Sequence, residues 1–270
     1  MTGKETGERH DVESIDAVKP RHTIAMVTPS SGPTARDVRV WHAHVDVLRR
    51  ADGAEERARA WLTPAETARY HRFRRDLDRD MFLLGRVMAR AIVGDALAVP
   101  PTSWPWREGA HGRPEIDLPD CRMAFNIAHS GGLVACAFSW THEVGVDIED
   151  RQRASLDIDL VARCCSPSEA ADVFARGDGW RDRFLQYWTL KESYLKARGF
   201  GISVHLGDLS FSLHDDDVRL DRHGSLAGED TWAFDLISLH ADHYLAVAAP
   251  VVDGTPPSFR FDPFPPVWLP

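Results

Sequence analysis

The chain has 270 residues, 43% of them hydrophobic and 27% charged, so it can form one large domain or two modest ones and is neither disordered nor fibrous. Its net charge of −9 argues against nucleic acid as the main partner, because neutralising phosphates needs a basic surface. The longest apolar run, residues 133–138, is far too short to span a membrane, so no membrane association is expected.

The amino-terminal segment and the cysteines indicate where the protein acts. Residues 1–35 mix charges with turn-forming residues and contain no apolar signal region, so we expect a mobile segment rather than a secretory leader. None of the four cysteines forms a Cys-x-x-Cys pair, and the adjacent Cys164 and Cys165 have a poor spacing for zinc. We therefore predict reduced thiols in a cytoplasmic protein.

The first half of the chain reads as a strand followed by helices. A strand is predicted from Val38 to Val47, and Thr63-Pro-Ala-Glu66 has the form of a capping box with proline at the first helical position. Apolar residues then recur with helical spacing from Arg79 to Val93. Between Arg69 and Arg90, seven arginines face only three aspartates. This basic segment indicates either a solvated helix face or a surface for an anion or an acidic partner.

A proline- and glycine-rich loop, residues 100–119, separates this helix from a pair of strands. Met123–Ala128 and Leu133–Phe138 are predicted strands, joined by the glycine turn His129-Ser-Gly-Gly132. A further strand is predicted from Val144 to Ile148.

The second half of the chain repeats this layout. Ser166-Pro-Ser-Glu169 is a second capping box, and a helix is predicted over Phe184–Gly201, with glycines at its end. Trp232–Ile237 and Tyr244–Ala249 echo the earlier pair of strands. These echoes occur in the same order and roughly a hundred residues apart, which predicts a duplicated helix-plus-sheet unit of ordinary domain size.

The duplication predicts an α+β fold of two similar halves. We expect a mobile segment at 1–35, an N-terminal half at 36–139, a C-terminal half at 140–250 and a surface strap at 251–270. A site shared between the halves would be natural, because pockets favour such interfaces. Since both half-sites lie in one chain, we expect a monomer.

Two carboxylates alternate with apolar residues in Gly145-Val-Asp-Ile-Glu149. On a strand, Asp147 and Glu149 point to one face, while Val146 and Ile148 point into a core. Buried carboxylates are costly without partners, and a hard divalent cation such as Mg²⁺ relieves their repulsion. The alternative is a strand end that leaves the core, with both acids in water.

The predicted helix and the glycine turn carry further candidates. Trp188, Glu192 and Lys196 recur at four-residue steps and so share one side of the helix, as they also would in an ordinary amphipathic helix. His129 lies in a turn whose glycines allow close approach of a ligand, so it could donate to a phosphate, although a loop histidine is often structural.

Together these motifs resemble those of the Sfp-type 4′-phosphopantetheinyl transferases over about residues 60–250. The motifs, in order, are Gly112-Arg-Pro114, Phe125–Ser130, Gly145–Glu149 and Phe184–Lys196. The resemblance implies a pseudo-twofold α+β fold with coenzyme A between its halves. It also implies transfer of 4′-phosphopantetheine from coenzyme A to a serine of an acyl or peptidyl carrier protein.

The resemblance assigns a role to each matching residue. The family's Mg²⁺ ligands correspond to Asp147, Glu149 and Glu192. Its lysine near the leaving group corresponds to Lys196, and its phosphate-contacting histidine corresponds to His129. The carrier serine must lose a proton to a base within hydrogen-bond reach, and Glu192 is our candidate for this catalytic role. The family's basic positions at coenzyme A correspond to Arg69 and Arg113, beside His129 and Lys196. We also expect coenzyme A contacts from Ser130, the last residue of the motif Phe125–Ser130, and from Lys191, which faces a different side of the helix from Glu192 and could serve the adenine or phosphate side. Three residues depart from the family pattern and leave the nucleotide grip in doubt: Ala128 replaces a serine, Glu66 a basic residue and Phe82 a threonine.

Two alternatives stay open at this point. A Mg²⁺-dependent nucleotide phosphohydrolase could use the same acids, and a catalytically silent carrier-binding protein could use the basic segment. The carrier, and whether it serves polyketide, non-ribosomal peptide or fatty-acid synthesis, is not determined by the sequence.

Overall fold

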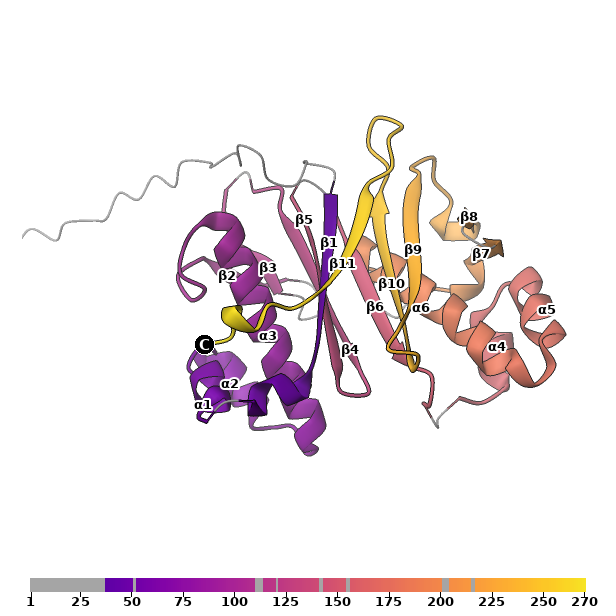
Figure 1. Cartoon of the computed structure of the whole chain (residues 1–270). Coiled ribbons are helices and arrows are strands. Elements are labelled where there is room, and N and C mark those ends of the chain that lie inside the picture. The colour runs from indigo at the N-terminus through magenta and orange to yellow at the C-terminus, as the bar shows by residue number, and fades with distance from the viewer. Residues whose placement is uncertain are drawn as a thin grey trace, which may run out of the picture. The chain divides into compact units, whose positions relative to one another are not determined.

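The computed structural model describes residues 37–50, 52–109, 114–119, 121–140, 143–153, 156–200, 204–214 and 217–270 (Figure 1). The predicted mobile segment 1–35 and the candidate Arg113 lie outside these residues. Among the described residues, no helix is both long enough and apolar enough to cross a membrane.

The first half contains one strand, three helices and two hairpins. In order these are β1 (Asp37–His44), α1 (Ala54–Arg59), α2 (Pro64–Tyr70), α3 (Asp76–Leu97), β2 (Trp106–Glu108), β3 (Pro114–Ile116), β4 (Ala124–Ser130) and β5 (Leu133–Ser139). The predicted capping box is present, since the Thr63 hydroxyl accepts from the Glu66 amide and the Glu66 carboxylate accepts from the Thr63 amide. β1 is shorter than predicted because Val45–Arg49 forms a 3-10 turn.

The second half repeats this element order. It consists of β6 (Gly145–Asp150), α4 (Asp159–Cys164), α5 (Pro167–Ala175), α6 (Trp180–Arg198), β7 (Leu209–His214), β8 (Asp217–Arg222), β9 (Trp232–Leu239) and β10 (His243–Pro250). Ser166 and Glu169 form the second capping box. The strands also repeat, because β1-β5-β4 and β6-β10-β9 are antiparallel in the same order. The duplicated α+β fold predicted from the sequence is therefore confirmed. The β2–β3 and β7–β8 hairpins take the same place in the two halves, and the sequence revealed neither of them.

The carboxyl-terminal segment is not the surface strap that was expected. Ser258–Pro263 forms β11, which pairs in parallel with β1 and becomes the edge of the first sheet. Its alternate residues Phe259 and Phe261 pack into the core between the sheets. A strand here pairs an edge of β1 that would otherwise be left open, and two aromatic side chains leave water.

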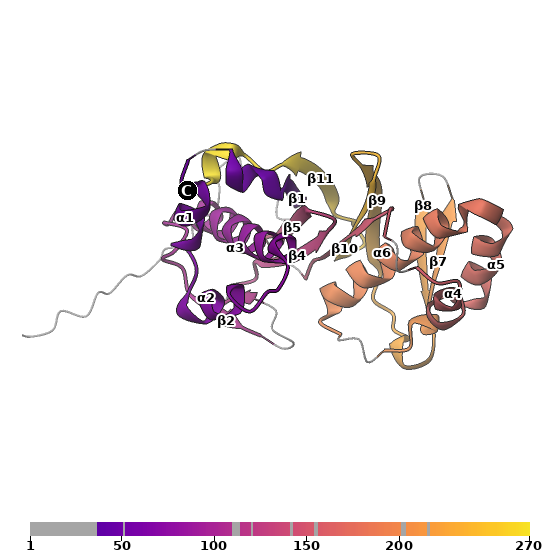
Figure 2. The same cartoon turned by 90° about the horizontal axis from the view of Figure 1, so that it is seen from below.

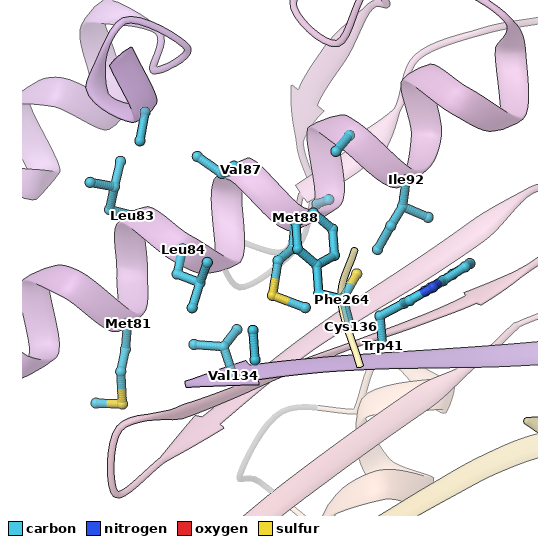
Figure 3. Packing of buried hydrophobic residues seen from close by; sticks show 14 of the residues in the cluster. Trp41, Met81, Leu83, Leu84, Val87, Met88, Ile92, Val134, Cys136 and Phe264 are labelled. Carbon is cyan, nitrogen blue, oxygen red and sulfur yellow. The ribbon is translucent and has the colours of Figure 1, made fainter. Parts of the chain in front are cut away.

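The two sheets pack against each other, and each is covered by its long helix on the other face (Figures 1 and 2). Val38 and Val40 of β1 meet Val146 and Ile148 of β6 in the shared core. On the outer face of the first sheet, α3 packs over β1 and β5, as Figure 3 shows. The residues of this contact include Leu84, Val87, Met88, Trp41, Val134 and Cys136. In this arrangement β4 of the first sheet lies beside β6 of the second sheet, where the two halves of the chain meet.

Candidate active site

The site begins at β6, whose two faces differ as predicted. Val146 and Ile148 belong to the core between the sheets, whereas Asp147 and Glu149 point the other way, toward α6. Both acids are almost fully buried, with 5% and 8% of their surfaces exposed. The reading in which this strand end leaves the core, with both acids in water, is therefore wrong.

Gly145 allows α6 to lie directly on β6. A Cβ atom at this position would lie 2.0 Å from the Ser193 carbonyl oxygen and 2.4 Å from the Ala197 amide nitrogen. Because these are backbone atoms, a side chain could be accommodated only by moving the helix off the strand. The glycine therefore brings the inner side of α6 within hydrogen-bond distance of the acids.

Asp147 and Lys196 form the centre of the site. The Lys196 Nζ donates to Asp147 Oδ1 over 2.6 Å, while Asp147 Oδ2 is buried and accepts no hydrogen bond from the described residues. Burial raises the pKa of Asp147 to about 6, although Lys196 opposes the shift. Burial alone would lower the pKa of Lys196, but attraction to Asp147, Glu192 and Glu149 raises it. One oxygen of Asp147 thus holds the lysine and the other is left for a further cation.

Glu149 is also held through only one of its two carboxylate oxygens. Its Oε1 accepts from the Trp188 indole over 2.8 Å and from the Arg153 guanidinium over 2.9 Å, whereas Oε2 has no hydrogen bond from the described residues. Burial, followed by repulsion from Asp147, raises the pKa of Glu149. The predicted shared side of the helix is confirmed, because Trp188 and Lys196 both reach the acids of β6.

Glu192 completes a set of three carboxylates that act on one another. Burial raises its pKa and repulsion from Glu149 adds to the shift, while Glu192 in turn raises the pKa of Asp147. Within the described part of the chain, no three His, Cys, Asp or Glu side chains are close enough together to hold a metal ion as they stand. The all-carboxylate donor set and the orphaned Asp147 Oδ2 nevertheless suit a hard cation such as Mg²⁺. These three ligands stay a prediction.

The first half contributes His129, at the end of β4. The side chain is exposed to solvent, yet surrounding protein lowers its pKa by desolvation, and the charges of Lys196 and Arg86 lower it further. Asp78 acts in the opposite direction. Charges from α3 and α6 therefore converge on a histidine that is neutral near pH 7.

Hydrogen bonds between β4 and β6 fix His129 relative to the acids. The Asn126 side-chain oxygen accepts from the Val146 amide over 3.0 Å, and the Ser130 hydroxyl accepts from the Asp150 amide over 3.1 Å. Ser130, predicted to contact coenzyme A, thus also joins the two halves. The hydroxyl keeps its own proton for a further partner.

Two family models match the chain. A model of the 4′-phosphopantetheinyl transferase superfamily matches residues 143–248, and a model of the 4′-phosphopantetheinyl transferase N-terminal part matches residues 54–141. The chain is 34% identical to the 4′-phosphopantetheinyl transferase Sfp of Bacillus subtilis over 163 residues, which are 60% of this chain and 70% of that protein. This chain belongs to the 4′-phosphopantetheinyl transferase family.

Other similar proteins include a phosphopantetheinyl transferase of Thraustochytrium sp., 32% identical over 226 residues and matched over 78% of each chain. A solved structure, the holo-(acyl-carrier-protein) synthase of Bacillus anthracis in complex with CoA (3′,5′-ADP), is 20% identical with a TM-score of 0.35. It covers 40% of this chain and 94% of that chain, and a likeness this low supports no conclusion about the site.

Lys191 corrects one prediction. From its place on the helix this lysine is predicted to contact coenzyme A, but its side chain is 1% exposed and pairs with Glu169 over 2.6 Å. It also donates to the carbonyl oxygens of Cys164 and Leu206. All three donors of the ammonium are thereby engaged inside the protein, so Lys191 holds α6 to α5 and does not contact a cofactor.

The departures at Glu66 and Phe82 also have structural explanations. Glu66 is buried and pairs with Arg86 over 3.0 Å and Arg90 over 2.7 Å, so it joins α2 to α3. Phe82 is buried as well, and the guanidinium of Arg69 lies 5.4 Å from the centre of its ring. Arg69 is exposed at the surface of this transferase, as a phosphate contact requires, and its role stays a prediction.

Arg153 is the residue at the site that sequence reasoning missed. It lies beyond the matched motif Gly145–Glu149. A separation of four residues from Glu149 predicts a side-chain contact on a helix, but it predicts none at the end of a strand. A charged residue close after a paired-acid strand was the only signal available.

Proposed function

We propose that this chain transfers 4′-phosphopantetheine from coenzyme A to a serine of an acyl or peptidyl carrier protein, with Mg²⁺ and with release of 3′,5′-ADP. The observation that supports this most directly is the 2.6 Å contact between Asp147 and Lys196, beside Glu149 and Glu192. A cluster that is acidic enough for a divalent cation, and also holds a cation of its own, suits a diphosphate substrate.

The three carboxylates would hold the magnesium ion. Asp147 would offer Oδ2, since Oδ1 is engaged by Lys196, and Glu149 would offer Oε2, since Oε1 is held by Trp188. When bound, the ion would offset the negative charge of the diphosphate.

Lys196 and His129 would stabilise the departing nucleotide. Lys196 is charged, and His129 has a lowered pKa, so that at pH 7 it donates as a neutral ring. Because they come from α6 and β4, the leaving group would be held from both halves of the chain.

Glu192 is proposed as the base that accepts the proton of the carrier serine. Burial raises its pKa toward neutrality, which suits a general base, and it accepts no hydrogen bond from the described residues. The serine oxygen would then form its bond to phosphorus as the bond to 3′,5′-ADP breaks.

A labelling experiment tests the proposal. The full chain is incubated with fluorescent coenzyme A, MgCl₂ and a panel of apo carrier proteins from polyketide, non-ribosomal peptide and fatty-acid synthesis. We expect Asp147→Asn and Glu192→Gln to reduce carrier labelling by about a hundredfold or more. Asp178→Asn, the same kind of change at an exposed turn, should label normally. Full labelling by either site variant would refute the assignment, and coenzyme A consumption without a carrier would favour a phosphohydrolase.

We also infer a monomer that acts in the cytoplasm. Cys121, Cys136, Cys164 and Cys165 are all unpaired, which suits a reducing compartment. Both halves of the site are contributed by one chain. Light scattering coupled to size exclusion tests the monomer, and a tagged chain in fractionated cells tests the location.

A further inference from the structure

Arg153 follows β6 in a turn whose backbone is fixed from two sides. Its amide donates to the Asp150 carbonyl oxygen over 3.1 Å, and its own carbonyl oxygen accepts from the Arg181 guanidinium over 2.8 Å. From this anchor the side chain extends over the ring of Trp188, with the guanidinium carbon 6.0 Å from the ring centre, and reaches Glu149. The placement of this positive charge is therefore built into the fold.

The charge of Arg153 acts on two of the three carboxylates. It pairs with Glu149 over 2.9 Å, and its field also opposes the rise in the pKa of Glu192 that burial causes. Lys196 pairs with the third carboxylate, Asp147, and its charge also opposes the rise in the pKa of Glu192. Asp147 and Glu149 are buried and Glu192 is half-buried, and these three acids face two resident cations that offset the cost of their burial.

Arg153 is somewhat more exposed than Lys196, whose side chain is 31% exposed. The Arg153 side chain is 38% exposed, so rotation about its own bonds can move the guanidinium into water without moving the anchored backbone. Glu149 would keep its orientation after this movement, because Trp188 still donates to the same oxygen, Oε1. The site therefore has a cation that can leave and an acid that stays in place.

We propose that Arg153 is the resident counter-ion of the acid cluster Asp147, Glu149 and Glu192, and that it competes with the divalent cation for this cluster. The proposal rests on the proposed function, because the cation is the Mg²⁺ of that reaction. In this view the arginine offsets part of the charge of the acids before the metal binds, and its repulsion sets how tightly the metal binds.

Metal binding without turnover tests this inference. Binding of Mn²⁺, as a paramagnetic substitute for Mg²⁺, is measured on the full chain by electron paramagnetic resonance, with no coenzyme A present. Removing a like charge beside a divalent cation should tighten binding, and we expect Arg153→Gln to lower the Kd for Mn²⁺ by about tenfold. Arg153→Lys, which keeps the charge, should stay close to the wild type.

Arg219→Gln is the matched control, because Arg219 pairs with Asp217 and with none of the site acids. It removes the same charge and should leave the Kd unchanged. Thermal unfolding and near-ultraviolet circular dichroism check that each variant keeps its fold. Unchanged or weaker Mn²⁺ binding by folded Arg153→Gln would overturn the inference, since Arg153 would then support the ligands. If neither the wild type nor Arg153→Gln binds Mn²⁺, the metal of the proposed function fails as well.

Discussion

The two halves of the chain share one frame but use equivalent positions differently. To compare β1 with β6, we number positions backwards from the residue that pairs with the first residue of the neighbouring antiparallel strand, which is β5 for β1 and β10 for β6. One position back lies Ala43 in the first half and Glu149 in the second, and three back lies Trp41 or Asp147. Each pair faces the long helix of its half. The first half fills these positions with apolar packing, and the second fills them with acids.

A second feature is common to both halves. The capping-box glutamate of the short helix is buried and paired with basic residues of the long helix, Glu66 with two arginines and Glu169 with Lys191. The shared frame thus includes a buried ion pair that joins the helices. The acids of β6 distinguish the half that would hold the proposed site, to which the other half would contribute His129.

The largest effect is expected where strand and helix touch in the second half. Gly145→Ala would place a Cβ atom 2.0 Å from the Ser193 carbonyl oxygen, so β6 and α6 must separate. We expect a loss of about 3 kcal/mol or more in the free energy of unfolding, together with the loss of carrier labelling. Chemical denaturation measures the first quantity and fluorescent labelling the second.

The first half provides the control for this change. A Cβ atom at Gly85 of α3 would meet the Ile127 Cγ2 at 3.0 Å, a side-chain atom that can shift. Gly85→Ala should cost no more than about 1 kcal/mol, because alanine also has the higher helix propensity. If both variants lost the same unfolding free energy, the backbones of β6 and α6 would not be packed more closely than those around Gly85.

The buried ion pairs give the next largest effect. Lys191→Met leaves Glu169 without a cation, and we expect a loss of about 3–5 kcal/mol in unfolding free energy. Arg86→Met should cost less, because Glu66 keeps Arg90. The double variant Lys191→Met, Glu169→Gln should recover part of the loss. A raised KM for coenzyme A in Lys191→Met at unchanged stability would restore the cofactor role that the structure contradicts.

At these equivalent positions only the second half can respond to pH, since Trp41 and Ala43 of β1 cannot ionise. The pKa of Asp147 is raised from 3.8 to about 6, so the folded state binds this proton more strongly than the unfolded chain does. Protonation therefore favours folding below pH 4, and this contribution is lost as the pH rises through about 6. Catalysis needs the ionised form, and we expect kcat/KM for coenzyme A to fall about tenfold per pH unit below pH 6. A flat profile down to pH 5 would exclude this titration.

The smallest effect is expected at the exposed basic residues of the first half. Arg72 and Arg75 lie between α2 and α3, are exposed, and form no ion pair with the described residues. If they attract an acidic carrier, Arg72→Gln with Arg75→Gln should raise the carrier's KM by about three- to tenfold and leave the KM for coenzyme A unchanged. Arg219→Gln serves again as the charge control. No change in the carrier's KM would leave the segment as a solvated surface.

The sequence predicted features that depend on neighbours along the chain. Both capping boxes, the glycine turn after His129 and the alternation in β6 follow from local spacing, and the structure contains all of them. The shared side of Trp188 and Lys196 also follows from helical periodicity. These rules act over a few residues and do not need the fold.

Features that depend on distant partners could not be predicted in this way. An exposed lysine at position 191 would be equally consistent with the helical pattern, because its burial is decided by Glu169 and by two carbonyl oxygens outside α6. Similarly, Ser258–Pro263 alternates like a strand, but its flanking prolines indicate a strap, and its partner β1 lies far away in the sequence.

β11 has a consequence for the order in which the molecule is made. Its residue Ser258 pairs with Asp37, which the ribosome adds 221 residues earlier. The first sheet therefore stays without its outer strand until synthesis has passed the whole second half, whose own sheet contains only strands made by then. The half that is translated first is the one that is completed last.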